Sequence, residues 1–376
     1  MHESFNRTRA RVLFVLPHLE AGGVERIVTN LLAHLDRDRF APGLVLFTRR
    51  GSLLAEVPAD VAICDLEGRP ARRLPFTLAR LFGEADLVYA GTNAANLASL
   101  AACRLMRRPP PVVISEHTPP AAYLGDAKMR PLRAMLMRWL YPGAAALAVP
   151  VPEIGAELCR LLDLPTLPVV AVPNPLVGEA VPASPPIAAA EGDPVFVSAG
   201  RLTREKGFDI LIEAFARLLR DQPLARLTIF GDGPERAALE DLGRRLGVAA
   251  RLRMPGFVRD PVVSFGKGAI FVLASRREGF GNVLIEALSA GLPVVAADCP
   301  VGPRIILDGG RCGLLVKPHD PEALAQGMRR MATEPSMADA FRRAGPDRAA
   351  PFAIGPAVEA HARLFESVAR HRSVPA

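Results

Sequence analysis

The chain alternates between short apolar runs of strand length and longer runs with helical spacing, and this alternation constrains its fold more than any other feature. The apolar run 11–17 is followed by a loop and then by residues 24–35, whose apolar side chains recur on one side of a helix. Strands that alternate with helices pair in parallel, because each helix carries the chain back to the same end of the sheet. The sequence therefore predicts an α/β protein built on parallel sheets.

One segment interrupts this alternation and divides the chain into two parts. Residues 179–194 are rich in proline and alanine and lack periodicity, so they are predicted to be a linker. We expect a Rossmann-like domain in residues 1–178 and a second in residues 195–355. A last helix within 356–376 is expected to pack back toward the N-terminal domain. Ligands bind beyond the carboxyl ends of parallel strands, so the two sheets are expected to face a cleft.

Composition and cysteine usage exclude several classes of protein. Half of the residues are hydrophobic, yet no apolar run reaches about 18 residues, so no transmembrane helix is predicted. The N-terminal apolar run is too short for a signal peptide. The five cysteines are scattered without a C-x-x-C pair, which indicates a reducing compartment and neither a disulfide framework nor a zinc site. We therefore expect a cytoplasmic protein.

The net charge of +7 is concentrated in residues 69–138, which hold eleven Lys and Arg against four Asp and Glu. A basic excess serves nucleic acid or an anionic membrane, and the apolar residues of this region favour the membrane over nucleic acid. Residues 127–140 have the spacing of a basic amphipathic helix. Two interpretations stay open: its apolar face lies in a membrane surface, or it packs into the N-terminal core while the cations remain solvated.

The stretch 269–297 joins a predicted buried strand, a turn containing Gly279 and Gly281, a helix and another strand. The first backbone N–H groups of such a helix have no intrahelical partner and favour an anion, such as a phosphate. Glu278 lies at the mouth of the turn, and Glu286 lies about two turns into the helix. Carboxylates are poor phosphate ligands but good acceptors for hydroxyls of a sugar or ribose. The stretch therefore predicts a nucleotide-sugar pocket.

Three further segments offer groups to the same ligand. Arg201 and Lys206 follow a predicted strand and suit a diphosphate, since Arg grips oxygens bidentately and Lys supplies a mobile charge. Gly22 and Gly23 open a helix with unobstructed amides, and His117 follows another strand, where its ring can meet a sugar hydroxyl. An alternative stays open for each segment. The Arg201–Lys206 loop can be a solvated surface loop, and Gly22-Gly23 a simple turn into a helix. His117 can be a strand-end histidine bonded to backbone.

Two competing motifs lack support in the sequence. The dinucleotide fingerprint G-x-G-x-x-G is absent from residues 21–23 and from residues 231–236, where Arg236 replaces the third glycine. The D-x-D sequence at 36–38 ends a predicted helix and is interpreted as solvated polarity rather than a metal site. No other cluster has metal-ligand spacing, so neither a metal nor another cofactor is expected.

Several stretches resemble the retaining family-4 glycosyltransferases, which have the two-domain GT-B fold. The matching stretches are AGGVERIVTNLLAHL at 21–35, SEHTPP at 115–120, VPNPL at 172–176, SAGRLTREKGFDILIEAFARLL at 198–219, IFGDGPERAALEDLGRRLGV at 229–248, PGFVRD at 255–260 and LASRREGFGNVLIEALSAGLPVVAADCPVGPRIIL at 273–307.

The resemblance implies which residues hold the donor, a nucleoside-diphosphate sugar bound mainly by the C-terminal domain. Arg201 and Lys206 would neutralise the diphosphate, Glu278 would meet the sugar hydroxyls, and Glu286 would bind the ribose. The catalytic set implied is Arg201, Lys206, Glu278 and His117. The donor-binding set implied is Gly22, Gly23, Val258, Phe280, Gly281, Asn282 and Glu286.

The activity implied is retaining transfer, without a metal, to a lipid-linked or surface-glycan acceptor. The enzyme is expected in the cytoplasm, peripheral on the inner face of the cell membrane. The family retains configuration by a front-face route in which the leaving phosphate takes the acceptor's proton. Residues 299–304 resemble members that use UDP-hexoses or UDP-N-acetylhexosamines. The alternatives are a sugar-nucleotide epimerase or hydrolase of the same fold, and a non-catalytic nucleotide-sugar-binding partner. The presence of both cations and both glutamates argues against the non-catalytic binding partner.

Overall fold

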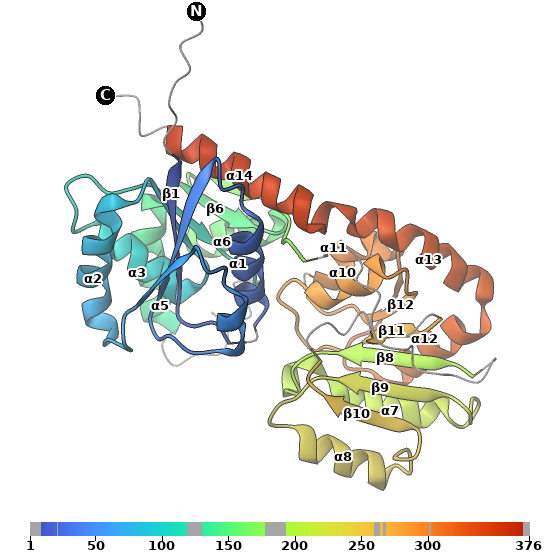
Figure 1. The fold of residues 1–376 in the computed structure, drawn as a ribbon. Coiled ribbons are helices and arrows are strands. Elements are labelled where there is room, and N and C mark those ends of the chain that lie inside the picture. The colour runs from blue at the N-terminus through green and yellow to red at the C-terminus, as the bar shows by residue number, and fades with distance from the viewer. Residues whose placement is uncertain are drawn as a thin grey trace, which may run out of the picture. The chain divides into compact units, whose positions relative to one another are not determined.

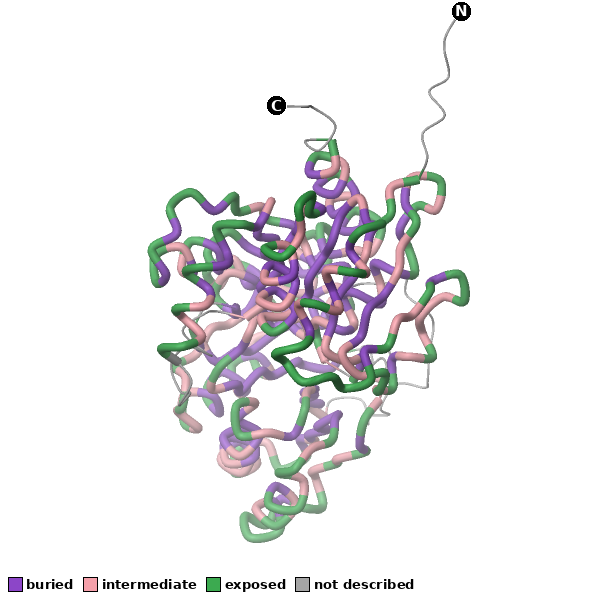
Figure 2. The backbone as a smooth tube through the Cα atoms, turned by 90° about the vertical axis from the view of Figure 1, so that its left-hand side faces the viewer, coloured by how far each residue is buried: buried purple, intermediate pink, exposed green. Residues whose placement is uncertain are grey.

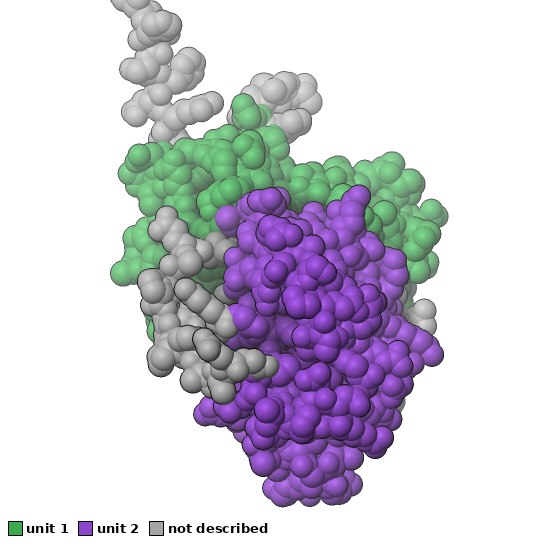
Figure 3. Space-filling view, turned by 90° about the vertical axis from the view of Figure 1, so that its right-hand side faces the viewer, with its two compact units in different colours: residues 1–176, 354–376 green, residues 177–353 purple. Residues whose placement is uncertain are grey.

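A computed structural model describes residues 9–20, 22–118, 130–176, 193–258, 264–265, 268–300 and 302–370. They form two compact units, one of Met1–Leu176 with Ile354–Ala376 and one of Val177–Ala353 (Figure 3). Residues 179–192 of the predicted linker lie outside the described residues. Each unit is described by itself below.

The first unit is built on a seven-stranded sheet in the order β3-β2-β1-β4-β5-β6-β7 (Figure 1). Every neighbouring pair is parallel. The strands are β1 (Ala10–Leu16), β2 (Phe40–Leu46), β3 (Ala62–Asp65), β4 (Leu87–Ala90), β5 (Val112–Ser115), β6 (Ala146–Val149) and β7 (Val169–Ala171). The helices are α1 (Gly23–His34), α2 (Leu74–Leu81), α3 (Asn93–Cys103), α5 (Arg130–Leu140), α6 (Pro152–Leu162) and α14 (Ile354–Arg370).

Helix α14 comes from the far end of the sequence and packs on this first sheet. The ring of Phe365 lies 6.0 Å from Phe14 of β1, 6.1 Å from Phe40 of β2 and 5.6 Å from Tyr89 of β4, between ring centroids. Such tilted and edge-to-face contacts stabilise aromatic pairs beyond simple burial. Arg39 adds ion pairs to two glutamates of α14. The first unit is therefore completed by residues that follow the second unit in the sequence.

Helices cover both faces of this sheet. Phe14 meets α14, whereas its neighbour Leu13 lines a pocket together with Leu81 of α2. Successive residues of a strand point to opposite faces, so α14 and α2 lie on opposite sides of β1. The central strands β4, β5 and β6 are buried along their whole length, whereas the edge strands β3 and β7 have no buried residue. Figure 2 colours the backbone by this burial.

The second unit has a six-stranded parallel sheet in the order β10-β9-β8-β11-β12-β13. Its strands are β8 (Val195–Ala199), β9 (Arg226–Phe230), β10 (Leu252–Gly256), β11 (Ile270–Leu273), β12 (Val294–Ala297) and β13 (Leu314–Val316). Its helices are α7 (Phe208–Leu218), α8 (Arg236–Arg245), α10 (Asn282–Ser289), α11 (Gly302–Ile306), α12 (Pro321–Thr333) and α13 (Pro335–Ala349). The two parallel sheets confirm the predicted α/β class.

His361 of α14 is fully buried against the first sheet, and this predicts a pH dependence of stability. Burial lowers the pKa of His361 to about 4, well below the ordinary value of 6.5. As the pH falls from about 6.5 toward 4, His361 is therefore protonated in the unfolded chain but stays neutral in the folded chain. We expect roughly 2 kcal/mol of unfolding free energy to be lost through this group between pH 7.5 and 5.

Urea unfolding of wild type and His361→Gln at both pH values measures this loss. The variant is expected to lose less stability on acidification than wild type. His34→Gln is the matched control, because His34 is exposed on α1 and makes the same kind of Nδ1 bond to the carbonyl four residues earlier. Equal acid sensitivity in all three proteins would contradict the prediction.

Candidate functional site

The loops that follow β8 and β11 carry the predicted charged residues of the second unit and bring them together. β8 and β11 are neighbours in the sheet, so the loops at their carboxyl ends lie next to each other. Lys206 Nζ donates to both carboxylate oxygens of Glu278, at 2.7 Å and 2.8 Å. The predicted cation and the predicted carboxylate thus form an ion pair, although they are far apart in the sequence.

Glu278 is tightly held in this site. Its side chain is 4% exposed, against 27% for Lys206. Ser275 Oγ donates to Glu278 Oε1 at 2.5 Å, so the carboxylate accepts hydrogen bonds from two different side chains. Cys299, in the turn after β12, is close enough for the Glu278 charge to act on it. Burial, assisted by that charge, raises the pKa of the Cys299 thiol to about 12, so it stays protonated at neutral pH.

Helix α10 begins directly beyond this carboxylate. Gly281 is its N-cap in a left-handed conformation with φ of 96°, and Asn282 is its first residue. Phe280 is buried and packs on Phe352, with ring centroids 5.4 Å apart. Glu286 is also buried. It is the fifth residue of α10, so it lies about one turn from the helix start at Asn282 and not the predicted two turns.

The remaining predicted donor residues of the second unit lie at the same edge of the sheet. Arg201 is exposed and follows Gly200 at the end of β8. Val258 is half-buried and follows β10, the edge strand, beside the exposed ring of Phe257. The parallel topology therefore gathers Arg201, Lys206, Glu278 and Val258 at the carboxyl edge, where ligands of such sheets bind.

In the first unit, a residue that the sequence did not single out lies against the predicted glycines. Gly22 is the N-cap of α1 and Gly23 is its first residue. The carboxylate of Glu25 folds back onto Gly22 so closely that a Cβ there would lie 2.1 Å from Oε2. His18 Nδ1 is 3.6 Å from Glu25 Oε1. The third position of a helix is where a glutamate turns back to the N-cap, and that signal could have revealed Glu25.

His117 is held through both ring nitrogens. Nδ1 lies 3.1 Å from Asn174 Oδ1, and Nε2 lies 3.1 Å from Ser115 Oγ. Burial lowers the pKa of His117 to about 4, with a further contribution from His361, so the ring is neutral at pH 7. One of these two hydrogen bonds must be exchanged before the ring can meet a hydroxyl of a ligand.

The next residue toward the strand, Glu116, is a second carboxylate that the sequence did not indicate. It is buried, and Tyr141 donates its hydroxyl to Oε1 at 2.5 Å. Asn96 Nδ2 donates to the same oxygen at 3.2 Å. Neighbouring positions at a strand end point to opposite faces, so Glu116 and His117 belong to separate polar clusters.

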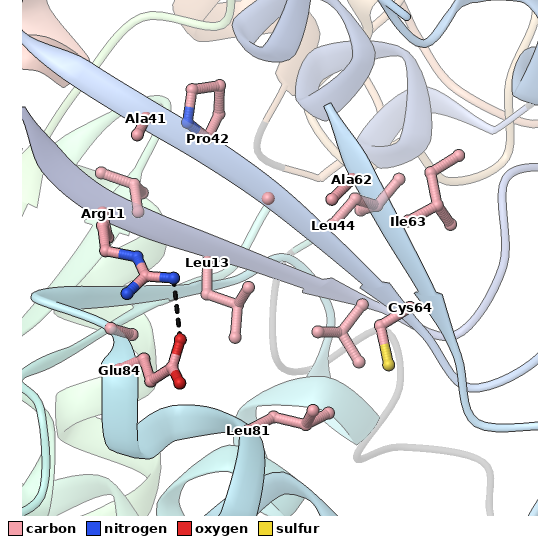
Figure 4. Close-up of a pocket in the computed structure, with 14 residues that line it drawn as sticks. Arg11, Leu13, Ala41, Pro42, Leu44, Ala62, Ile63, Cys64, Leu81 and Glu84 are labelled. Atoms are coloured by element: carbon pink, nitrogen blue, oxygen red, sulfur yellow. Dashed lines mark hydrogen bonds and ion pairs between the residues drawn. The ribbon is translucent and has the colours of Figure 1, made fainter. Parts of the chain in front are cut away.

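A pocket of about 360 Å³ lies elsewhere in the first unit (Figure 4). It is lined by the first half of β1, by β2 and β3, and by the turn before β4, with the Arg11–Glu84 ion pair at 2.8 Å beside it. The lining residues of β1 belong to its amino-terminal half, and Glu84 and Ala85 precede β4, so this part of the pocket lies away from the edge where parallel sheets bind ligands. None of the predicted site residues lines this pocket, so it is not the candidate site.

Helix α5 forms most of the basic amphipathic segment predicted at residues 127–140. Met137 and Leu140 are buried, whereas Leu132, Met135 and Trp139 are 42%, 56% and 57% exposed. The apolar residues of α5 are thus divided between the core and an exposed stripe. Arg104 stacks over the Trp139 ring at 4.9 Å from its centroid. Lys128 and Met129 of the predicted segment lie outside the described residues.

Within the described residues, no group of three or more His, Cys, Asp and Glu side chains is arranged to hold a metal ion. In the D-x-D sequence, Asp36 Oδ1 accepts the backbone N–H of Asp38, which closes the turn after α1. A search of the same residues found no helix with the length and apolar character needed to cross a membrane.

Comparison with known proteins matches the two units to two family models. Residues 21–176 match "Glycosyltransferase Family 4", and residues 183–348 match "Glycosyl transferases group 1". The crystal structure of HepE from Anabaena, in complex with UDP and glucose, aligns with a TM-score of 0.76 and 20% identity, over 96% of this chain and 100% of that one.

Two curated relatives differ in how much of their length is matched. An N-acetylgalactosaminyltransferase of Campylobacter jejuni, named for a diphospho-undecaprenol-linked acceptor, is 29% identical over 89% of this chain and 93% of its own length. An exopolysaccharide phosphotransferase of Streptomyces coelicolor is 34% identical over 46% of this chain. The chain spans only 19% of the length of the latter.

Gly207 should be needed for the close approach of the loop after β8 to the loop after β11. It has φ of 65°, and a Cβ there would lie 2.2 Å from the carbonyl oxygen of Ala274. Gly247 is the matched control, because it has φ of 71° with nothing within 4 Å of a Cβ. We expect Gly207→Ala to lower the free energy of unfolding by roughly 1–3 kcal/mol more than Gly247→Ala. Equal losses in urea unfolding would show that the close approach does not matter.

Proposed function

The chain belongs to the family-4-type GT-B glycosyltransferases, and we therefore propose that it is a retaining, metal-independent hexosyltransferase. Its donor is a UDP-hexose or a UDP-N-acetylhexosamine, and its acceptor is a lipid-linked or surface glycan. The observation that carries this proposal is the Lys206–Glu278 pair at the carboxyl edge of the second sheet, beside the start of α10. A cation for a diphosphate and a carboxylate for sugar hydroxyls are there held side by side.

Donor binding gives each partner of this ion pair a new ligand. Lys206 and Arg201 take the diphosphate, and Glu278 accepts hydrogen bonds from the sugar while Ser275 still fixes its Oε1. Helix α10 begins at Asn282, and the N-terminal end of a helix favours an anion such as the diphosphate. Glu286 takes the ribose, and Val258 lies beside the base. Gly22, Gly23 and His117 are proposed to contact the sugar or the acceptor.

The reaction breaks the bond between the anomeric carbon and the diphosphate. Negative charge grows on the leaving oxygen, and cations fixed in advance stabilise that charge most where water is excluded. The carboxylate of Glu278 already accepts hydrogen bonds from Lys206 and Ser275. The acceptor hydroxyl oxygen forms the new bond to the anomeric carbon on the same face as the bond that breaks, which retains the anomeric configuration. Its proton passes to the leaving phosphate.

Two comparisons support the choice of substrates. HepE is described in complex with UDP and glucose, and residues 299–304 of this chain resemble members that use UDP-linked hexoses. The Campylobacter relative is named for an acceptor on diphospho-undecaprenol. A lipid-linked acceptor would hold the reacting end at a membrane, so we propose a cytoplasmic enzyme that is peripheral on the inner face of the cell membrane.

Glu278→Gln should reduce transfer strongly while the fold is kept. Gln has the shape of Glu but lacks the charge, and a hydrogen bond to a charged group contributes roughly 1.5–3 kcal/mol, so we expect about 10- to 100-fold lower turnover. Transfer from a panel of UDP-sugars to a polyprenyl-diphosphate glycan measures this. Glu334→Gln is the control, since Glu334 forms a surface pair with Arg330.

The same assay separates the proposal from its competitors. Activity should survive EDTA, and the product should keep the donor's anomeric configuration by NMR. Donor consumption without an acceptor product would instead indicate an epimerase or hydrolase. Full transfer by a folded Glu278→Gln variant would remove Glu278 from the mechanism.

The exposed stripe of α5 should bind anionic membranes. Leu132, Met135 and Trp139 are exposed beside Arg133 and Arg138, and a helix with bulky apolar and cationic side chains can lie among lipid headgroups. Each basic residue near such a surface adds about 1 kcal/mol, and salt screens this attraction. We expect binding to vesicles with anionic lipid that weakens as salt rises.

Liposome co-sedimentation tests this with two sets of variants. Replacement of Leu132, Met135 and Trp139 by Ser, or of Lys128, Arg130, Arg133 and Arg138 by Gln, should weaken binding. Leu224→Ser with Leu246→Ser is the control, because these are exposed leucines of the second unit. Equal binding to neutral vesicles, or none to anionic ones, would contradict the membrane role.

A further inference from the structure

The loops that carry Lys206 and Glu278 are fastened together by one side chain, Arg276. Its Nη1 and Nη2 each donate to a different carboxylate oxygen of Asp209, both at 2.6 Å. Nη1 also donates to the carbonyl of Arg204 at 3.0 Å. The backbone N–H of Arg276 donates to the carbonyl of Glu205 at 2.8 Å. One residue of the loop after β11 therefore contacts three residues around the loop after β8.

We propose that Arg276 is a positioning residue for sugar transfer, because it sets the backbone from which Lys206 reaches the diphosphate. The inference rests on the proposed function and adds a residue to it that does not contact the donor. Its guanidinium is directed at Asp209 and at the carbonyl of Arg204, so it serves the loop rather than a ligand.

The position of Lys206 explains why this fastening matters. Arg204 and Glu205 immediately precede Lys206. The side chain of Arg276 donates to the carbonyl of Arg204, and its backbone N–H donates to the carbonyl of Glu205. Gly207, which follows, packs against the carbonyl of Ala274. The backbone of Lys206 is thus held to the second loop on both sides. A lysine side chain is long and flexible, so its ammonium can be placed reliably only if its Cα is fixed.

Asp209 fixes the orientation of the Arg276 guanidinium. It is the second residue of α7, so its carboxylate is tied to a helix that belongs to the core of the second unit. The two parallel hydrogen bonds of an Arg–carboxylate pair fix orientation as well as distance. Lysine in place of Arg276 would keep the charge but could not contact both oxygens of Asp209 and the Arg204 carbonyl in the same way.

Nucleotide binding by isothermal titration calorimetry, with UDP, GDP and ADP as probes, tests the proposal. We expect Arg276→Ala to weaken binding of the preferred nucleotide about tenfold, and Arg276→Lys and Asp209→Asn to weaken it less. In a Lys206→Ala background the same Arg276→Ala change should have almost no further effect on affinity. A residue that merely supports the fold would lower affinity in both backgrounds alike.

The Arg311–Asp308 pair provides the matched control. It is also bidentate, at 2.7 Å and 2.6 Å, and lies in the same unit, but it joins residues three apart on the surface. Arg311→Ala should leave nucleotide affinity unchanged. If Arg276→Ala unfolds the protein, Arg276→Lys and Asp209→Asn carry the same comparison in both backgrounds.

Each outcome decides one of the two claims. Wild-type protein that binds none of the three nucleotides overturns the proposed function, and the inference falls with it. Wild-type binding with equal affinities for the Arg276 and Arg311 variants overturns the inference alone. An affinity loss that persists undiminished in the Lys206→Ala background does the same, because it shows that Arg276 does not act through Lys206.

Discussion

The parallel arrangement of every strand is the constraint on which the candidate site depends. In a parallel sheet, all carboxyl ends lie at one edge, so the loops that leave neighbouring strands are forced together. β8 and β11 are neighbours, which is why Lys206 and Glu278 meet across 72 residues of sequence. The glycines at 207 and 281 then allow the loops to approach and the helix α10 to start, and Arg276 fastens them.

The ion pair between Lys206 and Glu278 fits the proposed donor-binding role better than it fits a role in stability. Removing a carboxylate from water is costly, and a buried pair often contributes less to stability than apolar side chains of the same volume. Glu278 is nevertheless almost fully buried, and it is satisfied by Lys206 and Ser275. A site that must take a diphosphate and sugar hydroxyls has a use for such opposite charges, whereas a hydrophobic core has none.

The sequence predicted the parts of the site that follow local rules. Apolar runs marked strands such as β8 and β11, and the turns after them marked Lys206 and Glu278 as groups for one ligand. The sequence did not reveal the side-chain hydrogen-bond partners that depend on tertiary structure. These are Asn174 for His117, Ser275 for Glu278 and Asp209 for Arg276. These pairs lack a local pattern, because each depends on which loops the sheet places side by side. The Glu25 carboxylate did have a local signal, its place in the first turn of α1.

The origin of α14 has a consequence for biosynthesis. Residues 354–370 complete the first unit, yet a ribosome makes them after the whole of the second unit. Until then the aromatic side chains of Phe14, Phe40 and Tyr89 lack the Phe365 ring that covers them in the finished protein. Domains generally fold as units while the nascent chain emerges, and exposed apolar surface attracts chaperones and aggregation partners. The first half of this protein to be translated is therefore the last to be finished.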